Sequence, residues 1–182
     1  MKQILRYLFL LVILVSCNKE IKNKRQISAV YNLKVSQKDS ISELWNILVF
    51  EKVGCLGGEQ YVSENKHQKE ERSLVFSEND WSKFSNNDIK KLTDFLITKL
   101  SDTTKTKIHT CPFFVATTGE MAVYSLQHIH KKNWFDFSEF KEFKEKEYAS
   151  ATEQPQIWLQ NILKNKNDRK ILAELYKKEL IK

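Results

Sequence analysis

Residues 117–130 read TTGEMAVYSLQHIH, and this stretch carries the pattern that sets the fold class. Thr117 stands three positions before Glu120, which is the spacing of a capping box at the start of a helix. Apolar side chains then recur at helical spacing: Met121, Ala122, Tyr124, Leu126 and Ile129. The stretch therefore predicts a capped helix that buries one face.

Four further segments carry helical signals. Two of them begin with a serine that is followed three positions later by an acidic residue: Ser40 with Glu43, and Ser85 with Asp88. The first predicted helix follows Ser40, carries its apolar residues between 44 and 53, and ends at Gly54; the second carries its apolar residues between 89 and 100. Pro155 suits a first helical turn and starts a fourth helix. A fifth helix runs over 171–180, and the last two helices predict a helical hairpin.

Glycine and proline are scarce in this chain. It has four glycines and two prolines among 182 residues. β-Sandwiches and barrels use these residues in their turns, so the shortage favours helices joined by polar loops. The glycine spacing also fits no phosphate-binding loop, dinucleotide fingerprint or nucleophile elbow. We expect a mainly α fold, a small helical domain of about five helices with a short β element near the N-terminus.

The β element is predicted from alternation. Apolar and polar residues alternate over residues 27–35, and a strand there needs a partner. The candidate partners are residues 74–76 and 113–115. Residues 59–73 are polar and charged, which predicts an exposed loop.

The N-terminus has the three zones of a signal peptide. Lys2 and Arg6 precede an unbroken apolar run, YLFLLVILV, at residues 7–15. The run has the length of a signal h-region and is shorter than the roughly 20 residues of a membrane-spanning helix. The signal segment closes with Leu-Val-Ser-Cys at residues 14–17, with the cysteine at Cys17.

This ending resembles the lipobox of bacterial lipoproteins. The resemblance implies cleavage after residue 16, lipidation of Cys17 and anchoring in the lipid bilayer through its acyl chains, which include palmitate. It divides the chain into a signal peptide (1–16), a lipidated tether (17–26) and a single mostly helical domain (27–182). Asn18 follows the cysteine where an aspartate would favour the inner membrane, so we expect an envelope location, at the outer membrane facing the periplasm or the exterior. An ordinary secretory signal with a chance cysteine is the alternative.

The net charge of the mature chain limits the classes of partner that it is expected to bind. Removal of residues 1–16 takes two of the 30 basic residues and none of the 23 acidic ones, which leaves a net charge of +5. The excess is modest and no basic stretch is interleaved with aromatic residues. We expect no nucleic acid and no cofactor, and a protein partner that the sequence does not identify.

Two cysteines remain after lipidation. Cys55 and Cys111 form an even pair in an oxidising compartment, which predicts a disulfide bond. Two buried free thiols, or a redox or catalytic role, are the alternatives.

Residues 107–120 collect a histidine, a cysteine and a proline beside the predicted helix start. One hypothesis is a metal or acid–base site built from His109, Cys111, Glu120 and His128. The alternative is that Glu120 only caps the helix and Cys111 only anchors the disulfide. We expect no metal, because the histidines lack the i, i+4 helical pair of zinc proteases.

Aromatic residues crowd the stretch after residue 133. They are Trp134, Phe135, Phe137, Phe140 and Phe143. These rings either fill the core, or form an interaction patch of Trp134, Phe135, Phe137 and Phe140 for a partner or the bilayer.

The sequence as a whole favours binding over catalysis. We expect a membrane-anchored lipoprotein that acts as an adaptor or as a protective, immunity-like protein. An envelope hydrolase that uses His109, Glu120 and His128 is the rival hypothesis. It requires these three side chains to meet in one pocket.

Overall fold

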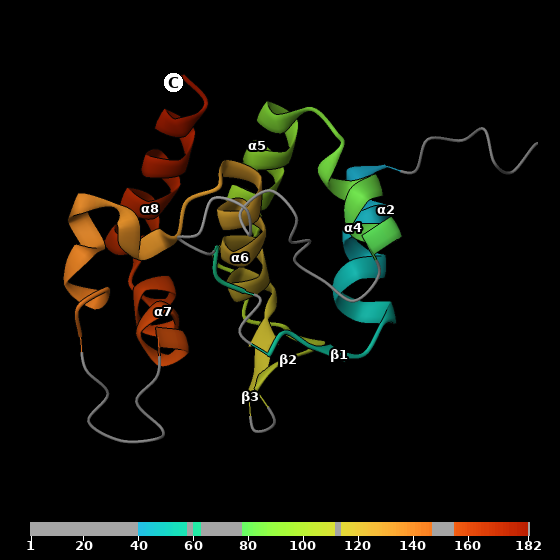
Figure 1. The fold of residues 1–182 in the computed structure, drawn as a ribbon, viewed down its shortest axis with the longest axis horizontal. Helices are drawn as coiled ribbons and strands as arrows, with labels where there is room; N and C mark the ends of the chain where they lie inside the picture. The colour runs from blue at the N-terminus through green and yellow to red at the C-terminus, as the bar shows by residue number, and fades with distance from the viewer. Residues whose placement is uncertain (1–39, 58–59, 63–77, 112–113, 147–154, 182) are drawn as a thin grey trace, which may run out of the picture. The chain divides into compact units, whose positions relative to one another are not determined.

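The computed structural model describes residues 40–57, 60–62, 78–111, 114–146 and 155–181. This part of the chain is mainly helical and holds a small three-stranded sheet, which confirms the predicted fold class (Figure 1). The signal peptide, the tether, the predicted strand at 27–35 and its candidate partner at 74–76 lie outside the described residues. No helix within the described ranges is long and apolar enough to cross a membrane.

The first predicted helix begins where its capping box places it. Ser40 accepts a hydrogen bond from the Glu43 backbone N–H at 3.2 Å, and its own N–H donates to the Glu43 carboxylate at 2.7 Å. The helix is α2 (Ile41–Asn46), which continues as a π-helical turn, η1 (Ile47–Glu51). The helical segment therefore ends at Glu51, three residues before the predicted end at Gly54.

The second capping box is wrong in one residue. Ser85 is the last residue of a helix that the sequence did not predict, α4 (Glu78–Ser85), and Asp88 alone caps α5 (Ile89–Lys99) by accepting from the Lys91 N–H at 2.9 Å. The cause lies in the turn between the two helices. The Asn87 side-chain amide donates to two carbonyls at the end of α4, so one helix ends there and a new one begins after it.

The sheet has the order β1-β2-β3. Its strands are β1 (Gly54–Cys55), β2 (Lys105–Cys111) and β3 (Phe114–Thr117), with β1 parallel and β3 antiparallel to β2. Phe114 and Val115 lie in β3, as the candidate at 113–115 suggested. The sequence pattern did not predict β2, because its buried positions alternate between threonines and Ile108, which is a weak apolar signal.

Helix α6 (Thr118–His130) is the centre of the described unit (Figure 1). Its residues 118–128 are all buried. Helix α5, strand β3, α7 (Pro155–Lys164) and α8 (Lys166–Glu179) all contact it. A helix covered on every side buries polar as well as apolar side chains, so each polar group needs a partner inside the protein.

The C-terminal helices confirm the predicted hairpin. Pro155 begins α7, and Asn165 caps α8 by accepting from the N–H groups of Asn167 and Asp168. Before the hairpin, the aromatic stretch forms two 3₁₀ turns, η2 (Trp134–Asp136) and η3 (Ser138–Phe143).

The predicted exposed loop at 59–73 is wrong at its start. Gln60 and Val62 are buried. The side-chain amide of Asn133 binds both backbone groups of Val62, donating to its carbonyl at 2.9 Å and accepting from its N–H at 2.8 Å. The Gln127 side chain donates to the Gln60 carbonyl at 2.6 Å. We call residues 60–62 the strap.

Candidate functional site: a pocket beside the N-terminus of helix α6

Glu120 is a fully buried acidic residue at the centre of the fold, with no exposed surface. It completes the predicted capping box. Its carboxylate accepts from the Thr117 N–H at 2.7 Å, and its own N–H donates to the Thr117 hydroxyl at 3.2 Å. One carboxylate oxygen is therefore committed to the helix start.

The other carboxylate oxygen of Glu120 accepts from two glutamines of α7. Gln156 donates to it at 2.8 Å and Gln160 at 3.2 Å. Gln156 is itself held, because the Thr110 hydroxyl of β2 donates to its side-chain carbonyl. Buried polar groups that are fully paired in this way join a strand and two helices.

The N-terminus of α6 is closed to ligands. The Thr118 N–H donates to the Thr104 carbonyl at 2.8 Å and the Gly119 N–H to the Asp102 carbonyl at 2.9 Å. A Cβ at Gly119 would lie 2.8 Å from the Leu100 carbonyl oxygen, so only glycine lets this loop approach the helix. The first N–H groups, which bind anions at open helix starts, are occupied here by the protein.

The rival hydrolase site does not assemble. His128 lies eight residues after Glu120 on α6, which is about 12 Å along the helix axis. Its ring packs edge-on against Trp81, with ring centres 6.0 Å apart. His109 lies on β2, half-buried and paired with Cys55 and Val115. Within the described ranges, no group of three or more His, Cys, Asp or Glu side chains can hold a metal ion.

The predicted disulfide is not formed in the structure. Cys55 is exposed and its thiol is free, so the alternative of two buried thiols is wrong for this residue. Cys55 pairs with His109, two residues before Cys111 on the neighbouring strand. Regular strand spacing then separates the two Cα atoms by about 8 Å, beyond the roughly 4.4–6.8 Å usual for disulfides. The Cys111 side chain lies outside the described part, and the pairing stays a prediction.

The aromatic stretch lies in the core. Trp134 has no exposed surface, and Phe137 and Phe140 are buried as well, while Phe135 and Phe143 are partly buried and pack on the core. The interaction patch is therefore wrong for Trp134, Phe137 and Phe140. The rings contact one another and α8, as in the 5.0 Å edge-on pair of Phe137 with Tyr176.

A pocket of about 390 Å³ opens next to the start of α6. Its size falls within the roughly 300–1,000 Å³ of small-molecule sites. It lies where the loop after α5, strand β3 and the second half of α7 come together. The lining residues are Leu100, Asp102, Thr103, Lys105, Phe114, Val115, Thr117, Gly119, Gln160, Leu163 and Lys164.

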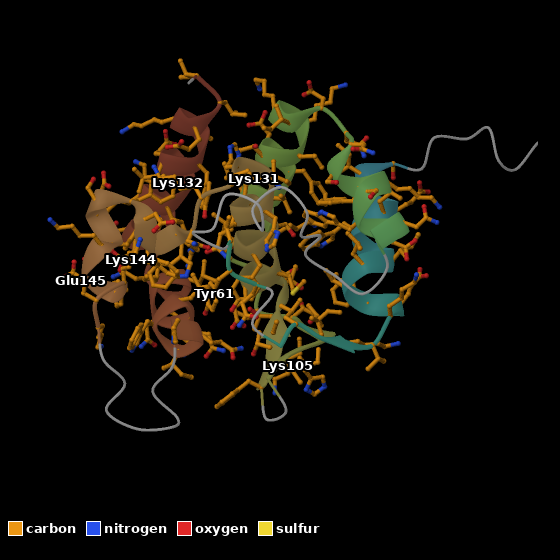
Figure 2. All side chains as sticks on the ribbon, viewed as in Figure 1. Tyr61, Lys105, Lys131, Lys132, Lys144 and Glu145 are labelled. Carbon is orange, nitrogen blue, oxygen red and sulfur yellow. The ribbon has the colours of Figure 1, made fainter. Side chains whose placement is uncertain are left out.

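Two lysines give the pocket its charge. Lys105 begins β2 and Lys164 ends α7, and both are exposed (Figure 2 labels Lys105). Neither forms an ion pair with a residue in the described part of the chain. Asp102 is the one acidic lining residue, and its carboxylate accepts from the Thr104 N–H at 2.9 Å.

Sequence reasoning missed this pocket. Its lining comes from segments up to 64 positions apart, between Leu100 and Lys164. The available signal was Thr117-x-x-Glu120 beside a glycine, which the sequence assigned either to a helix cap or to the rival site with His109 and His128. The structure keeps the capping assignment and adds that Gln160, which binds Glu120, also lines the pocket.

His130 is the histidine with the most informative environment. Thr93 donates its hydroxyl proton to the Ile89 carbonyl at 2.7 Å, so at 2.9 Å it accepts from the Nε2–H of His130. Burial lowers the pKa of His130 and the nearby Glu179 charge partly opposes this. The ring also packs on Tyr176 of α8, with ring centres 5.6 Å apart, and so joins α5, α6 and α8.

Comparisons with known proteins give no relative. No protein-family model, no curated protein and no solved structure matches the chain. The function is therefore inferred from the sequence and the site alone.

Proposed function

We propose that this chain is a lipid-anchored protein of the bacterial cell envelope that acts by binding, as an adaptor or as a protective, immunity-like protein. The anchor rests on the apolar run at 7–15 and the lipobox-like ending at Cys17. Two or more acyl chains on one cysteine hold a protein stably on a membrane, whereas one chain holds it only marginally. Asn18 favours the outer membrane.

One observation carries the choice of binding over hydrolysis. Both carboxylate oxygens of Glu120 are committed to hydrogen bonds that hold the fold together. A general acid or base must reach the proton that it transfers. Glu120 is instead enclosed, and neither His109 nor His128 is among its hydrogen-bond partners. Glu120, the acid of the rival hypothesis, therefore has a role in folding. Exposed polar groups lie at the pocket rim instead, and they include those of Lys105 and Lys164.

The anchor is tested by labelling. Cells that express the full chain are grown with an alkyne analogue of palmitate, and the protein is examined for label and by intact mass. We expect label on the wild type and none on Cys17→Ala, with the matched control Cys55→Ala labelled as fully as the wild type. Label that persists on Cys17→Ala would show that the lipobox interpretation is wrong.

The binding role is tested by photocrosslinking in intact cells. A benzoylphenylalanine is placed, one at a time, at exposed positions on different elements: Val53 after η1, Ile89 on α5 and Ile171 on α8. A binding protein should give an adduct of one defined mass at one or two of these positions and none at the others. No adduct at any position, or the same mixture at all three, would count against a specific partner.

A further inference from the structure

The pocket beside α6 has apolar walls. Leu100, Phe114, Val115 and Leu163 contribute them, from the end of α5, from β3 and from α7. Leu100 and Leu163 also belong to the core, which fixes that side of the cavity. Walls of this kind gain free energy by covering the apolar part of a ligand, by roughly 25 cal/mol for each Å² removed from water.

The rim of the pocket is cationic. Lys105 and Lys164 are exposed, and neither forms an ion pair with a residue in the described ranges. The acidic lining residue, Asp102, already holds the Thr104 N–H. An anionic group at this rim would therefore meet two unpaired positive charges against the one negative charge that Asp102 keeps.

Hydroxyl donors complete the lining. The Thr117 oxygen accepts from Glu120 and keeps its own proton for a second bond, and Thr103 is exposed. The occupied N–H groups of α6 contribute nothing to an anion here. Recognition of charge therefore depends on the two lysine side chains, which lets substitution test it directly.

We propose that this pocket binds a small amphipathic carboxylate, with its apolar body against Leu100, Phe114, Val115 and Leu163 and its anionic head at Lys105 and Lys164. The inference goes beyond the proposed partner binding, because it names a second, small ligand. It needs neither the lipid anchor nor a protein partner to be right.

The test compares three probes that share one apolar body. These are 3-phenylpropanoate, the neutral 3-phenylpropanamide and the cationic 3-phenylpropylamine. Each is titrated by calorimetry and by saturation-transfer NMR into the purified mature lipoprotein in detergent, with empty detergent micelles as the blank. We expect the carboxylate to bind with a Kd of roughly 1 mM, as its size allows, and at least about threefold more tightly than the amide, with weaker binding at high salt.

Substitutions then locate the site. Lys105→Gln and Lys164→Gln should each weaken the carboxylate about twofold to fivefold, as expected for exposed ion pairs, and should leave the amide unchanged. Lys91→Gln, at an exposed lysine near the other end of α5, is the matched control and should have no effect. Thr103→Trp places a large ring at an exposed lining position and should abolish binding of both probes. Circular dichroism melts check that each variant is folded.

Three outcomes would overturn the inference. They are equal affinity for all three probes, strongest binding of the amine, or no heat and no saturation transfer at about 10 mM carboxylate, ten times the expected Kd. Loss of binding in Lys91→Gln would equally place the site elsewhere. None of these outcomes bears on palmitate labelling or crosslinking, so failure of this inference is distinguishable from failure of the proposed function.

Discussion

The two ends of helix α6 both bury polar side chains, and they supply hydrogen-bond partners for them in different ways. At the C-terminal end, Gln127 and Asn133 bind the strap at 60–62, and aromatic rings seal the region. At the N-terminal end, Glu120 is bound by Thr117 and the glutamines of α7, and a pocket opens beside it. Both ends pair these buried polar groups. The N-terminal end differs in having a pocket whose two lysines find no ion-pair partner among the described residues.

This comparison shows how to interpret polar residues in a buried helix. Glu120 and His128 attract attention as catalytic candidates because of their chemistry, yet the structure uses one in hydrogen bonds and packs the other against Trp81. A polar group carries functional information when it keeps unused hydrogen-bonding or charge capacity at an open surface. By that criterion Lys105 and Lys164 are better candidates than either.

Trp134→Ala should have the largest effect on stability. Trp134 is fully buried and contacts the rings of Phe135, Phe140 and Phe143 at 5.2–6.1 Å. Removal of a buried tryptophan side chain lowers the free energy of unfolding by about 3–5 kcal/mol. Denaturant unfolding measures it, with the exposed Ile171→Ala as a control that should change little. A variant as stable as the wild type would show that Trp134 is not part of the core.

Asn133→Ala should release the strap. It leaves the N–H and carbonyl of Val62 without the partner that now binds both. Unpaired buried groups cost about 1–3 kcal/mol each, and water reaches both groups in part once the strap is released, so we expect a loss of about 2–4 kcal/mol in unfolding free energy. Hydrogen exchange should quicken at 60–62 before it does in α6. The exposed Asn161→Ala is the control, and equal stability of both variants would contradict this role of the strap.

Some of this arrangement is predictable from sequence and some is not. Local patterns predicted α2, α6, α7 and α8, because capping and apolar spacing act between residues close in the chain. The bond between Asn133 and Val62 spans 71 positions, and that between Gln156 and Glu120 spans 36. No local pattern encodes such pairs. The pocket is formed by the same kind of long-range contact. The sequence therefore predicted only the capping box beside it, at Thr117 and Glu120.

Gly119→Ala should test how closely the loop after α5, which lines the pocket, approaches α6. Alanine normally stabilises a helix interior by about 1 kcal/mol relative to glycine. Here its Cβ would lie 2.8 Å from a backbone oxygen of Leu100, and such overpacking costs about 1–3 kcal/mol. We expect a net loss of about 1 kcal/mol in thermal or denaturant unfolding. A gain in stability would mean that the loop moves freely, and that the pocket wall is not fixed.

Acidification should weaken the C-terminal end through His130. Its pKa is lowered by burial, so below the ordinary pKa near 6.5 the unfolded chain binds more protons than the folded protein. Stability is complete above that pH and falls as the pH drops below it. Unfolding free energies between pH 7.5 and 5.5 should fall more for the wild type than for His130→Gln. Parallel curves for the two proteins would contradict this.

The role of Glu120 in the fold, through its bond to Gln156, is the claim on which the rest depends. A double-mutant cycle tests it most directly, with unfolding free energies measured for the wild type, Glu120→Gln, Gln156→Ala and the double variant. We predict that the two effects are not additive, with a coupling of about 1 kcal/mol or more. The distant control Lys91→Gln should show no coupling to Glu120→Gln. Additive effects of the Glu120 and Gln156 substitutions, within about 0.3 kcal/mol, would contradict the claim.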